Sequence, residues 1–334
     1  MSEREFKVKV PKLWKPSSNF CNFHQHSKFS KLDCLIKIDQ LAQKVVDLGG
    51  RAIAVSDHGN MGSLWELWKC TQELKEYDNI DIKPLYGIEF YFVDDRNNRD
   101  ERAYNHLTCY AMNLQGLQNL MYLTSSSYIT GMYGKPRIDW ELLKSHGEGI
   151  VGLSGCIIGK IPELLVKGEE LQAMDALNKF KSVFNGHFYL ELQPSSLDFQ
   201  IKINDLLVKF GEKTDTKVVM TTDSHYLEKQ DFNIHETMLC IQTQSVLSDP
   251  KRFSFECPEF YYADEKDIEE RINVGHQDSV KEAFRASIDN TLEIVNLCNV
   301  DLDFKEVYFP TFPVPEKEEE FHQYWNKAKC SSLV

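Results

Sequence analysis

Short apolar runs alternate with longer amphipathic stretches over the first two thirds of this 334-residue chain. The apolar runs are rich in residues that favour β-strands, and they lie at residues 20–23, 52–56, 83–93, 106–112, 150–154, 187–193 and 217–222. The amphipathic stretches have the spacing of helices, and they lie at residues 35–48, 63–77, 114–129, 139–145, 169–184 and 199–210. Strands that alternate with helices in this way are typical of parallel βα units. The pattern therefore predicts an α/β protein, either a barrel or a doubly wound sheet.

Polar residues with reactive side chains follow strand after strand, which favours the barrel. They are His24, His26, Asp57, His58, Glu89, Cys156, Asp223 and His225. In a parallel barrel the carboxyl ends of all strands meet at one rim, where barrel enzymes build their sites. We therefore expect these residues, which are far apart in the sequence, to lie together as one cluster.

The alternation stops after about residue 230. Residues 233–242 and 268–297 have helical patterns, and residues 301–315 are irregular, with three prolines. We accordingly expect four parts: an N-terminal segment (1–18), the barrel (19–255), a mostly helical extension (256–300) and an acidic, proline-containing linker or tail (301–334).

Charge is divided unevenly between these parts. The chain has 38 basic and 51 acidic residues, for a formal net charge of −13. Residues 256–334 hold 8 basic and 18 acidic residues, whereas residues 1–255 hold 30 and 33. Proteins that bind nucleic acid tightly on their own usually carry a basic face, so this balance argues against such a binder. We expect the chemistry to reside in the near-neutral barrel.

The N-terminal residues and the cysteines indicate the compartment. The first fifteen residues include five basic ones but no apolar stretch, so we expect neither a signal peptide nor a membrane span. The nine cysteines form no CxxC pair, and their number is odd. We therefore expect a cytoplasmic protein with reduced cysteines.

His24 and His26 point to metal chemistry. Alternate residues on a strand face the same way, so this pair can present two imidazoles to one ion. Asp223 and His225 repeat the spacing with a carboxylate, and with Cys156 the donors exceed what a single four-coordinate ion needs. Two or more neighbouring divalent ions are the usual solution for phosphoester hydrolysis. The alternative, a structural zinc cluster, is generally closed and rich in cysteine.

Eight motifs, in order along the chain, carry a resemblance to a known family. They are Phe23-His-Gln-His-Ser-Lys-Phe-Ser-Lys-Leu-Asp33, Ser56-Asp-His-Gly-Asn-Met61, Asn105-His-Leu107, Tyr133-Gly-Lys-Pro-Arg-Ile-Asp-Trp140, Leu153-Ser-Gly-Cys156, Phe188-Tyr-Leu-Glu-Leu-Gln193, Asp223-Ser-His-Tyr-Leu227 and Leu239-Cys-Ile-Gln-Thr243. From about Phe23 to His322 the chain resembles the N-terminal PHP (polymerase and histidinol phosphatase) domain of C-family bacterial DNA polymerases, the DNA polymerase III alpha subunits. The fourth and eighth motifs resemble this polymerase branch rather than the free-standing histidinol phosphatases.

The resemblance implies a distorted (β/α)7 barrel with a mostly helical C-terminal extension and a site for up to three divalent ions, for which zinc, manganese or iron would be suitable. The nine ligands that it implies are His24, His26, Asp33, His58, Glu89, His106, Cys156, Asp223 and His225. By the same resemblance Glu89 would bridge two ions, and Asp57 would orient the neighbouring ligands without binding an ion itself. His106 lies in an expected strand, and only the resemblance gives it a role.

The ligands would divide into three groups. In the family pattern, one of the ions that Glu89 bridges is also held by the residues that correspond to His24, His26 and Asp223. The other bridged ion would be held by His106 and Cys156. The third ion would be held by Asp33, His58 and His225.

The activity that the resemblance implies is 3′–5′ exonuclease proofreading of DNA during replication, through in-line attack of an activated water on the terminal phosphodiester. Glu89, Asp223 and Asp57 would be its catalytic residues. Lys135 and Arg137, on a loop that contains glycine and proline, would contact phosphate, and the alternative is that they belong to a solvated turn.

The partners implied are a DNA 3′ end and a polymerase core of palm, fingers and thumb, possibly on a separate chain. We expect the chain not to polymerise alone, because it lacks the aspartates of the palm. Asp301 and Asp303 are not candidates for this pair, since they follow a helix rather than lying on paired strands. Two other functions stay open: a structural module that supports a polymerase core, and a free-standing phosphoesterase. The location would be the cytoplasm of a bacterium, or of the host for a bacteriophage protein.

The remaining histidines lie outside the pattern of strand ends. They are His146, His187, His235, His276 and His322. We expect them at the surface or in hydrogen bonds rather than at a metal.

Overall fold

Eight strands form one curled sheet, a half-barrel, in the computed structural model, which describes residues 4–12, 14–99 and 103–304. The strands are β1 (Ala52–Val55), β2 (Lys83–Phe92), β3 (Asn105–Ala111), β4 (Met132–Tyr133), β5 (Lys135–Ile138), β6 (Ile150–Leu153), β7 (Phe188–Leu192) and β8 (Val218–Met220). Their order across the sheet is β4-β5-β2-β3-β6-β7-β8, and β1 pairs with the first half of β2. Six of the seven predicted strands are confirmed.

Strand β3 runs antiparallel to both of its neighbours, which corrects the expectation of a wholly parallel sheet. In the register Glu89 of β2 faces Thr108, and Cys109 faces Gly152 of β6. The reason is the connection between β2 and β3, which contains no helix in its described part and so cannot make a parallel crossover. The start of β3 therefore lies at the same edge as the carboxyl end of β2.

The predicted strand at residues 20–23 is wrong, and the residues that follow it close the gap between β1 and β8. The Ser56 amide donates to the Gln25 carbonyl (2.7 Å), and the His26 amide donates to the Ser224 carbonyl (3.1 Å). Gln25 and Ser224 form an isolated parallel bridge. The bridge is isolated and does not extend into a ladder, but these bonds hold the segment between the ends of two strands.

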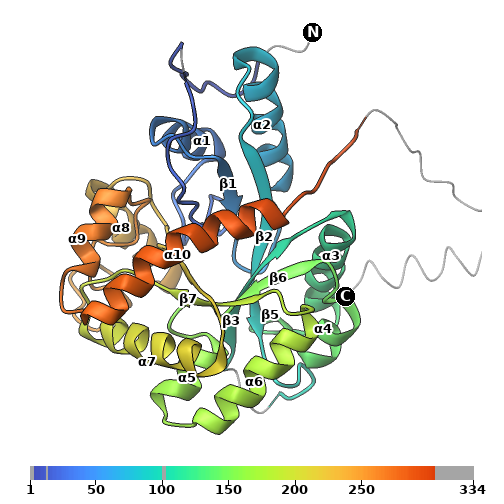
Figure 1. Cartoon of the computed structure of the whole chain (residues 1–334), viewed down its shortest axis with the longest axis vertical. Helices are drawn as coiled ribbons and strands as arrows, with labels where there is room; N and C mark the ends of the chain where they lie inside the picture. The colour runs from blue at the N-terminus through green and yellow to red at the C-terminus, as the bar shows by residue number, and fades with distance from the viewer. Residues whose placement is uncertain (1–3, 13, 100–102, 305–334) are drawn as a thin grey trace, which may run out of the picture. The chain divides into compact units, whose positions relative to one another are not determined.

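Helices surround the curled sheet (Figure 1). In the described residues they are α1 (Ile38–Asp47), α2 (Leu64–Asp78), α3 (Leu114–Ile129), α4 (Trp140–His146), α5 (Lys160–Val166), α6 (Glu170–Val183), α7 (Asp198–Thr214), α8 (Phe232–Thr243), α9 (Glu265–Ile272) and α10 (Asp278–Leu297), with a 3-10 turn at Lys229–Asp231. Asn113 and Asp139 cap α3 and α4 by accepting backbone N–H bonds. The sequence predicted neither α5 nor the break between α9 and α10.

Helix α10 completes the core of the barrel. Its Ile294 and Val295, with Cys298 beyond its end, are buried against residues that point inward from six strands and from the segment before β1. Residues 256–300 thus share one compact unit with the barrel, and a second unit begins at Asp301, where the tail was predicted. Whether this helical part faces a polymerase core stays a prediction. Most of the predicted tail, with His322, lies outside the described residues.

None of the described helices is both long and apolar enough to cross a membrane.

Candidate metal centre

The structure brings the nine predicted ligands together at one edge of the sheet. His24 and His26 lie in the segment that closes the gap between β1 and β8, and Asp33 follows this segment. Glu89 lies inside β2 and His106 near the start of β3, and the loops after strands supply the other four: His58, Cys156, Asp223 and His225. The sequence predicted Glu89 at the end of β2, but it lies three residues before that end, where pairing with β1 has ended. Asp33, His58 and His106 are half-buried, and the other six are buried.

The first group of donors surrounds His24. Its Nε2 lies 2.9 Å from Glu89 Oε1 and 3.2 Å from Asp223 Oδ1. His26 Nε2 lies 3.3 Å from the same Asp223 oxygen and 3.6 Å from Glu89 Oε2. All of these distances are short enough for one ion to contact the donors together.

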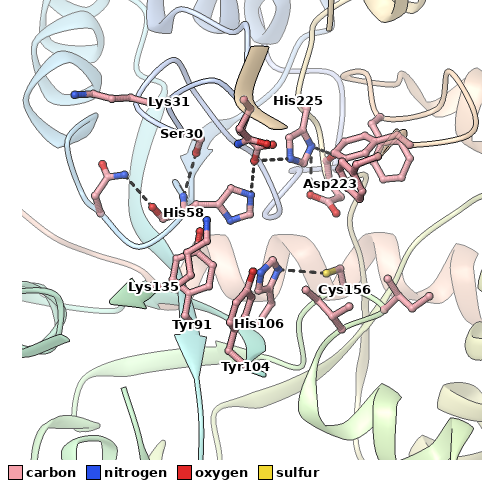
Figure 2. Close-up of a pocket in the computed structure, with 18 of the residues that line it drawn as sticks. Ser30, Lys31, His58, Tyr91, Tyr104, His106, Lys135, Cys156, Asp223 and His225 are labelled. Carbon is pink, nitrogen blue, oxygen red and sulfur yellow. Dashed lines mark hydrogen bonds and ion pairs between the residues drawn. The ribbon is translucent and has the colours of Figure 1, made fainter. Parts of the chain in front are cut away.

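The second group joins Glu89 to His106 and Cys156. His106 Nδ1 lies 2.7 Å from Glu89 Oε1 and 3.5 Å from Cys156 Sγ (Figure 2). Gly155 allows this approach, because it has a φ of +77° and an added Cβ would lie 2.6 Å from the His106 carbonyl oxygen. The turn before Cys156 is therefore packed directly against the start of β3.

The third group consists of Asp33, His58 and His225. Asp33 Oδ2 lies 2.7 Å from His58 Nε2 and 3.5 Å from His225 Nε2. The other ring nitrogen of His58, Nδ1, lies 2.6 Å from Glu89 Oε2. Glu89 is therefore in contact with a histidine from each of the three groups.

Several of these buried atoms face one another without forming hydrogen bonds. Among the described residues, no partner with hydrogen-bond geometry is found for His24 Nε2, His26 Nε2, His58 Nδ1, Asp223 Oδ1 or either carboxylate oxygen of Glu89. Leaving so many buried polar atoms unpaired would be costly. Three sets of donors also lie within 4.8 Å of one another: His24, His26 and Glu89; His58, Glu89 and His106; and His26, His58 and His225. The arrangement fits lone pairs that face shared cations.

The electrostatics of the cluster fit cations as well. Burial raises the pKa of the Cys156 thiol well above its usual value, and the carboxylates of Glu89 and Asp223 raise it further. Burial, together with His58 and His225, lowers the pKa of His26 to about 3. His26 is therefore neutral and able to act as a ligand, whereas Cys156 would need a nearby cation to become the thiolate that binds metal.

Asp57 lies behind the cluster and holds the loop that follows His26. Its carboxylate accepts hydrogen bonds from the Ser27 amide (2.7 Å) and from the Ser30 hydroxyl (2.9 Å). The Ser30 oxygen lies 3.3 Å from His26 Nδ1 and accepts a hydrogen bond from the His58 amide (3.0 Å). Asp57 thus reaches two candidate ligands through one serine.

Glu191 is a functional candidate that the sequence reasoning missed. It is the fourth of the five residues of β7, is 1% exposed, and has Oε1 2.5 Å from His24 Nδ1. The same oxygen accepts hydrogen bonds from Thr221 (2.6 Å) and Gln193 (3.0 Å). Such a carboxylate fixes the tautomer and orientation of a ligating histidine, here with Nε2 facing the other donors. The signal available in the sequence was a single acidic residue inside an apolar strand.

Asp223 has a backbone conformation that is unusual for a residue with a side chain. Its φ is +46°, in the left-handed region that non-glycine residues rarely adopt and that Asp and Asn tolerate best. The turn after β8 thereby directs the carboxylate of Asp223 toward His24 and His26.

The two predicted phosphate ligands have different positions. Lys135 lines the cavity above the cluster, with its ammonium nitrogen 5.0 Å from the centre of the Tyr91 ring. Arg137 is 1% exposed and does not line the cavity; its guanidinium donates to the backbone carbonyls of Arg96 (2.8 Å) and Asn98 (3.1 Å). The geometry therefore corrects the prediction for Arg137. The two residues are two positions apart on β5 and share a face of the strand, but the guanidinium of Arg137 is buried among backbone carbonyls and only Lys135 lines the cavity.

The other described histidines are not among the nine donors. His235 donates from Nε2 to the Asp33 carbonyl (2.8 Å), and His276 Nε2 lies 3.0 Å from Asn204 Nδ2. His146 stacks on Tyr122 and bonds to Ser145.

A cavity of about 930 Å³ opens above the donors. Figure 2 shows Lys135, Tyr91 and Tyr104 grouped on one side of His58 and His106. A volume of this size is typical of sites that enclose an organic ligand.

Comparisons with known proteins agree with this geometry. Residues 22–195 match the PHP domain family. The chain is 36% identical over 312 residues to a DNA polymerase III subunit alpha of Thermus aquaticus, 34% over 312 residues to that of Deinococcus radiodurans, and 33% over 306 residues to that of Treponema pallidum. These matches cover 90%, 89% and 90% of the chain but only 25%, 22% and 25% of the relatives, so the chain spans about a quarter of their length. The chain belongs to the PHP domain family.

Proposed function

We propose that this chain is a metal-dependent phosphodiesterase that removes nucleotides from the 3′ end of DNA during replication. The observation that carries the proposal is the position of Glu89, whose carboxylate oxygens lie 2.6–2.9 Å from three imidazoles. Donors that combine imidazole, carboxylate and one thiol suit two or three divalent ions, with zinc, manganese and iron as candidates. When bound, such ions lower the pKa of a water and offset the negative charge of the phosphate.

The chain's own residues would orient these donors and receive the substrate. Glu89 would connect the three groups, and Asp223 would complete the first group with His24 and His26. Glu191 would hold His24, and Asp57 would hold the loop that carries His26. Lys135 would pair with a phosphate oxygen at the wall of the cavity.

DNA is the substrate that the similarity to DNA polymerase III alpha subunits supports. Because the chain spans about a quarter of these relatives, we propose that it works beside a polymerase core that lies elsewhere. The relatives come from bacteria, and we propose a cytoplasmic location for this chain as well.

The test uses the whole chain, loaded with zinc or manganese, and a single-stranded DNA labelled at its 5′ end. The critical variant is Asp223→Asn, because asparagine tolerates the left-handed backbone and removes only the charge. Asp81→Asn is the matched control, since that side chain is 84% exposed and does not line the cavity. We expect stepwise shortening from the 3′ end, with a loss of activity of about a hundredfold or more in Asp223→Asn and none in Asp81→Asn.

The alternatives give different results. If the metal-loaded wild type leaves DNA intact but stabilises a polymerase core added in trans, the chain is a structural module. If it hydrolyses a small phosphomonoester and ignores DNA, it is a free-standing phosphoesterase.

A further inference from the structure

Aromatic side chains form part of the lining of the cavity above the donors. They include one set of tyrosines, Tyr91, Tyr104 and Tyr128, and a second set of phenylalanines, Phe253, Phe255 and Phe260. We call the second set the phenylalanine wall. Phosphate binding does not account for the phenylalanine rings, because they offer neither a hydrogen-bond donor nor a positive charge. The aromatic surface therefore indicates a substrate with a large apolar part.

Phe253 is the exposed member of the phenylalanine wall. Its side chain is 54% exposed although it is large and apolar, and it stands edge-on to Phe255 with ring centres 5.7 Å apart. Phe255 in turn packs on Phe260 at 4.5 Å. The ring of Phe253 is thus supported from behind by two packed rings, while much of its surface remains open.

The phenylalanine wall is in direct contact with the donor cluster. The ring of Phe255 lies edge-to-face with that of His225, with centres 4.9 Å apart and planes at 86°. A group stacked on Phe253 would therefore lie one side chain away from a candidate metal ligand. This distance is suited to a nucleotide whose base is at the wall and whose phosphodiester is at the donors.

Positive charge around the cavity is sparse. Apart from the histidines, the basic residues that line it are Lys31 and Lys135. A protein that gripped DNA through its phosphates would need many more. Stacking on aromatic side chains binds single strands instead, and it tolerates every base because each has a flat face.

We propose that Phe253 is the residue that selects the substrate, by stacking on the unpaired base of the 3′-terminal nucleotide. This inference rests on the proposed exonuclease function and specifies its substrate as a strand whose last base is free. A paired terminal base lies in its own stack with its edge bonded to the partner strand, so it would have to be extruded before it could reach Phe253. Stacking would recognise the flat face that every base has, so the terminal base would be accepted whichever of the four it is.

The first experiment compares two single strands that differ only in the terminal nucleotide, which carries either a base or an abasic sugar. Wild type, Phe253→Ala, Phe253→Tyr and Tyr122→Ala are assayed with zinc or manganese. Tyr122 is the matched control because it is an aromatic residue of similar exposure, 49%, that does not line the cavity. We expect wild type and Tyr122→Ala to prefer the base-bearing strand by about tenfold in kcat/KM, the usual scale for one stacked base. Phe253→Ala should remove most of this preference, and Phe253→Tyr should retain it.

The second experiment measures stacking without catalysis. A strand ending in the fluorescent base 2-aminopurine, joined through a non-hydrolysable linkage, is titrated with each protein. Stacking on Phe253 should quench the fluorescence in wild type and Phe253→Tyr, and much less in Phe253→Ala.

The outcomes separate this inference from the function on which it rests. Cleavage of both strands at equal rates, unchanged in Phe253→Ala, would overturn the role of Phe253 and leave the exonuclease intact. Cleavage of neither strand, with quenching that depends on Phe253, would support the stacking site and overturn the exonuclease. Neither cleavage nor quenching would overturn both.

Discussion

His106 Nδ1 lies 2.7 Å from Glu89 Oε1, although the two residues belong to strands that run in opposite directions. His106 is the second residue of β3, and Glu89 lies in the second half of β2. Because β3 runs antiparallel to β2, its first residues lie at the edge of the sheet where β2 ends, and His106 joins the donors there. Glu89 becomes the shared member of the cluster because it lies on β2 next to the start of β3.

Replacing Glu89 by glutamine should remove more metal than any other single substitution. Its oxygens contact His24, His58 and His106, one from each donor group, so the loss of its charge weakens all three. We expect the amount of zinc or manganese retained after dialysis, measured by mass spectrometry, to fall by at least one ion per chain. Glu141→Gln, at a side chain that is 75% exposed, should retain the wild-type amount. Equal metal content in Glu89→Gln and wild type would contradict the shared role.

Replacing Glu191 should weaken metal binding without removing a ligand. In Glu191→Ala the Nδ1 of His24 loses its partner at 2.5 Å, whereas in Glu191→Gln the amide oxygen can still accept that bond. Changes to partners of this kind typically cost 10–100-fold in metal affinity. We expect the dissociation constant for zinc, measured by competition with a chelator, to increase in the order wild type, Gln, Ala. Equal weakening in the two variants would show that charge, and not orientation, is what Glu191 supplies, because both variants remove the charge.

Metal binding should release protons and strengthen as the pH rises from 6 to 8. Burial lowers the pKa of His58, but Glu89 and Asp33 raise it to about 10, and the pKa of Cys156 is raised as well. Both groups are therefore protonated below pH 8 in the metal-free protein and must lose a proton to become ligands, so acid opposes binding. Calorimetric titrations with zinc in buffers of different ionisation enthalpy should give different heats. Heats that do not depend on the buffer would contradict this.

Gly155→Ala should disturb the cluster at Cys156. The added Cβ would meet the backbone carbonyl of His106 at 2.6 Å, in addition to the strain of a φ of +77°. Gly186→Ala is the matched control, since Gly186 has a φ of +86° but nothing within 4 Å of its Cβ. We expect urea unfolding to show a loss of about 1 kcal/mol for the control and a clearly larger loss for Gly155→Ala. Only Gly155→Ala should also lose metal.

Most of the strands and helices could be predicted from the sequence. Short apolar runs bounded by polar residues mark the strands, and amphipathic stretches with helical spacing mark the helices. The same polar residues at strand ends predicted one cluster, and the structure brings them together. His106 could not be assigned from its pattern alone, since the direction of β3 depends on the loop before it and not on the strand itself. The segment at 20–23 has the composition of a strand, but it forms no ladder, and the bridge to the turn after β8 is made by Gln25, two residues beyond it.

Side chains that act through others were the hardest to predict. Glu191 has no spacing pattern that distinguishes it from any buried acid, and its role depends on the orientation of His24. Arg137 and Lys135 share a motif and a face of β5, but the backbone carbonyls of Arg96 and Asn98 bind the Arg137 guanidinium and keep it out of the cavity. Such roles depend on contacts between distant segments, which a single sequence does not record.

The position of helix α10 bears on what can fold independently. The family match ends at residue 195, yet two of the nine donors, Asp223 and His225, and the core residues Ile294 and Val295 all come later in the chain. A fragment cut at the limit of the match would lack part of its active edge and would expose the apolar interior that α10 covers. The compact unit therefore extends to Val300, and any rearrangement that moves this domain between proteins must carry α10 with it.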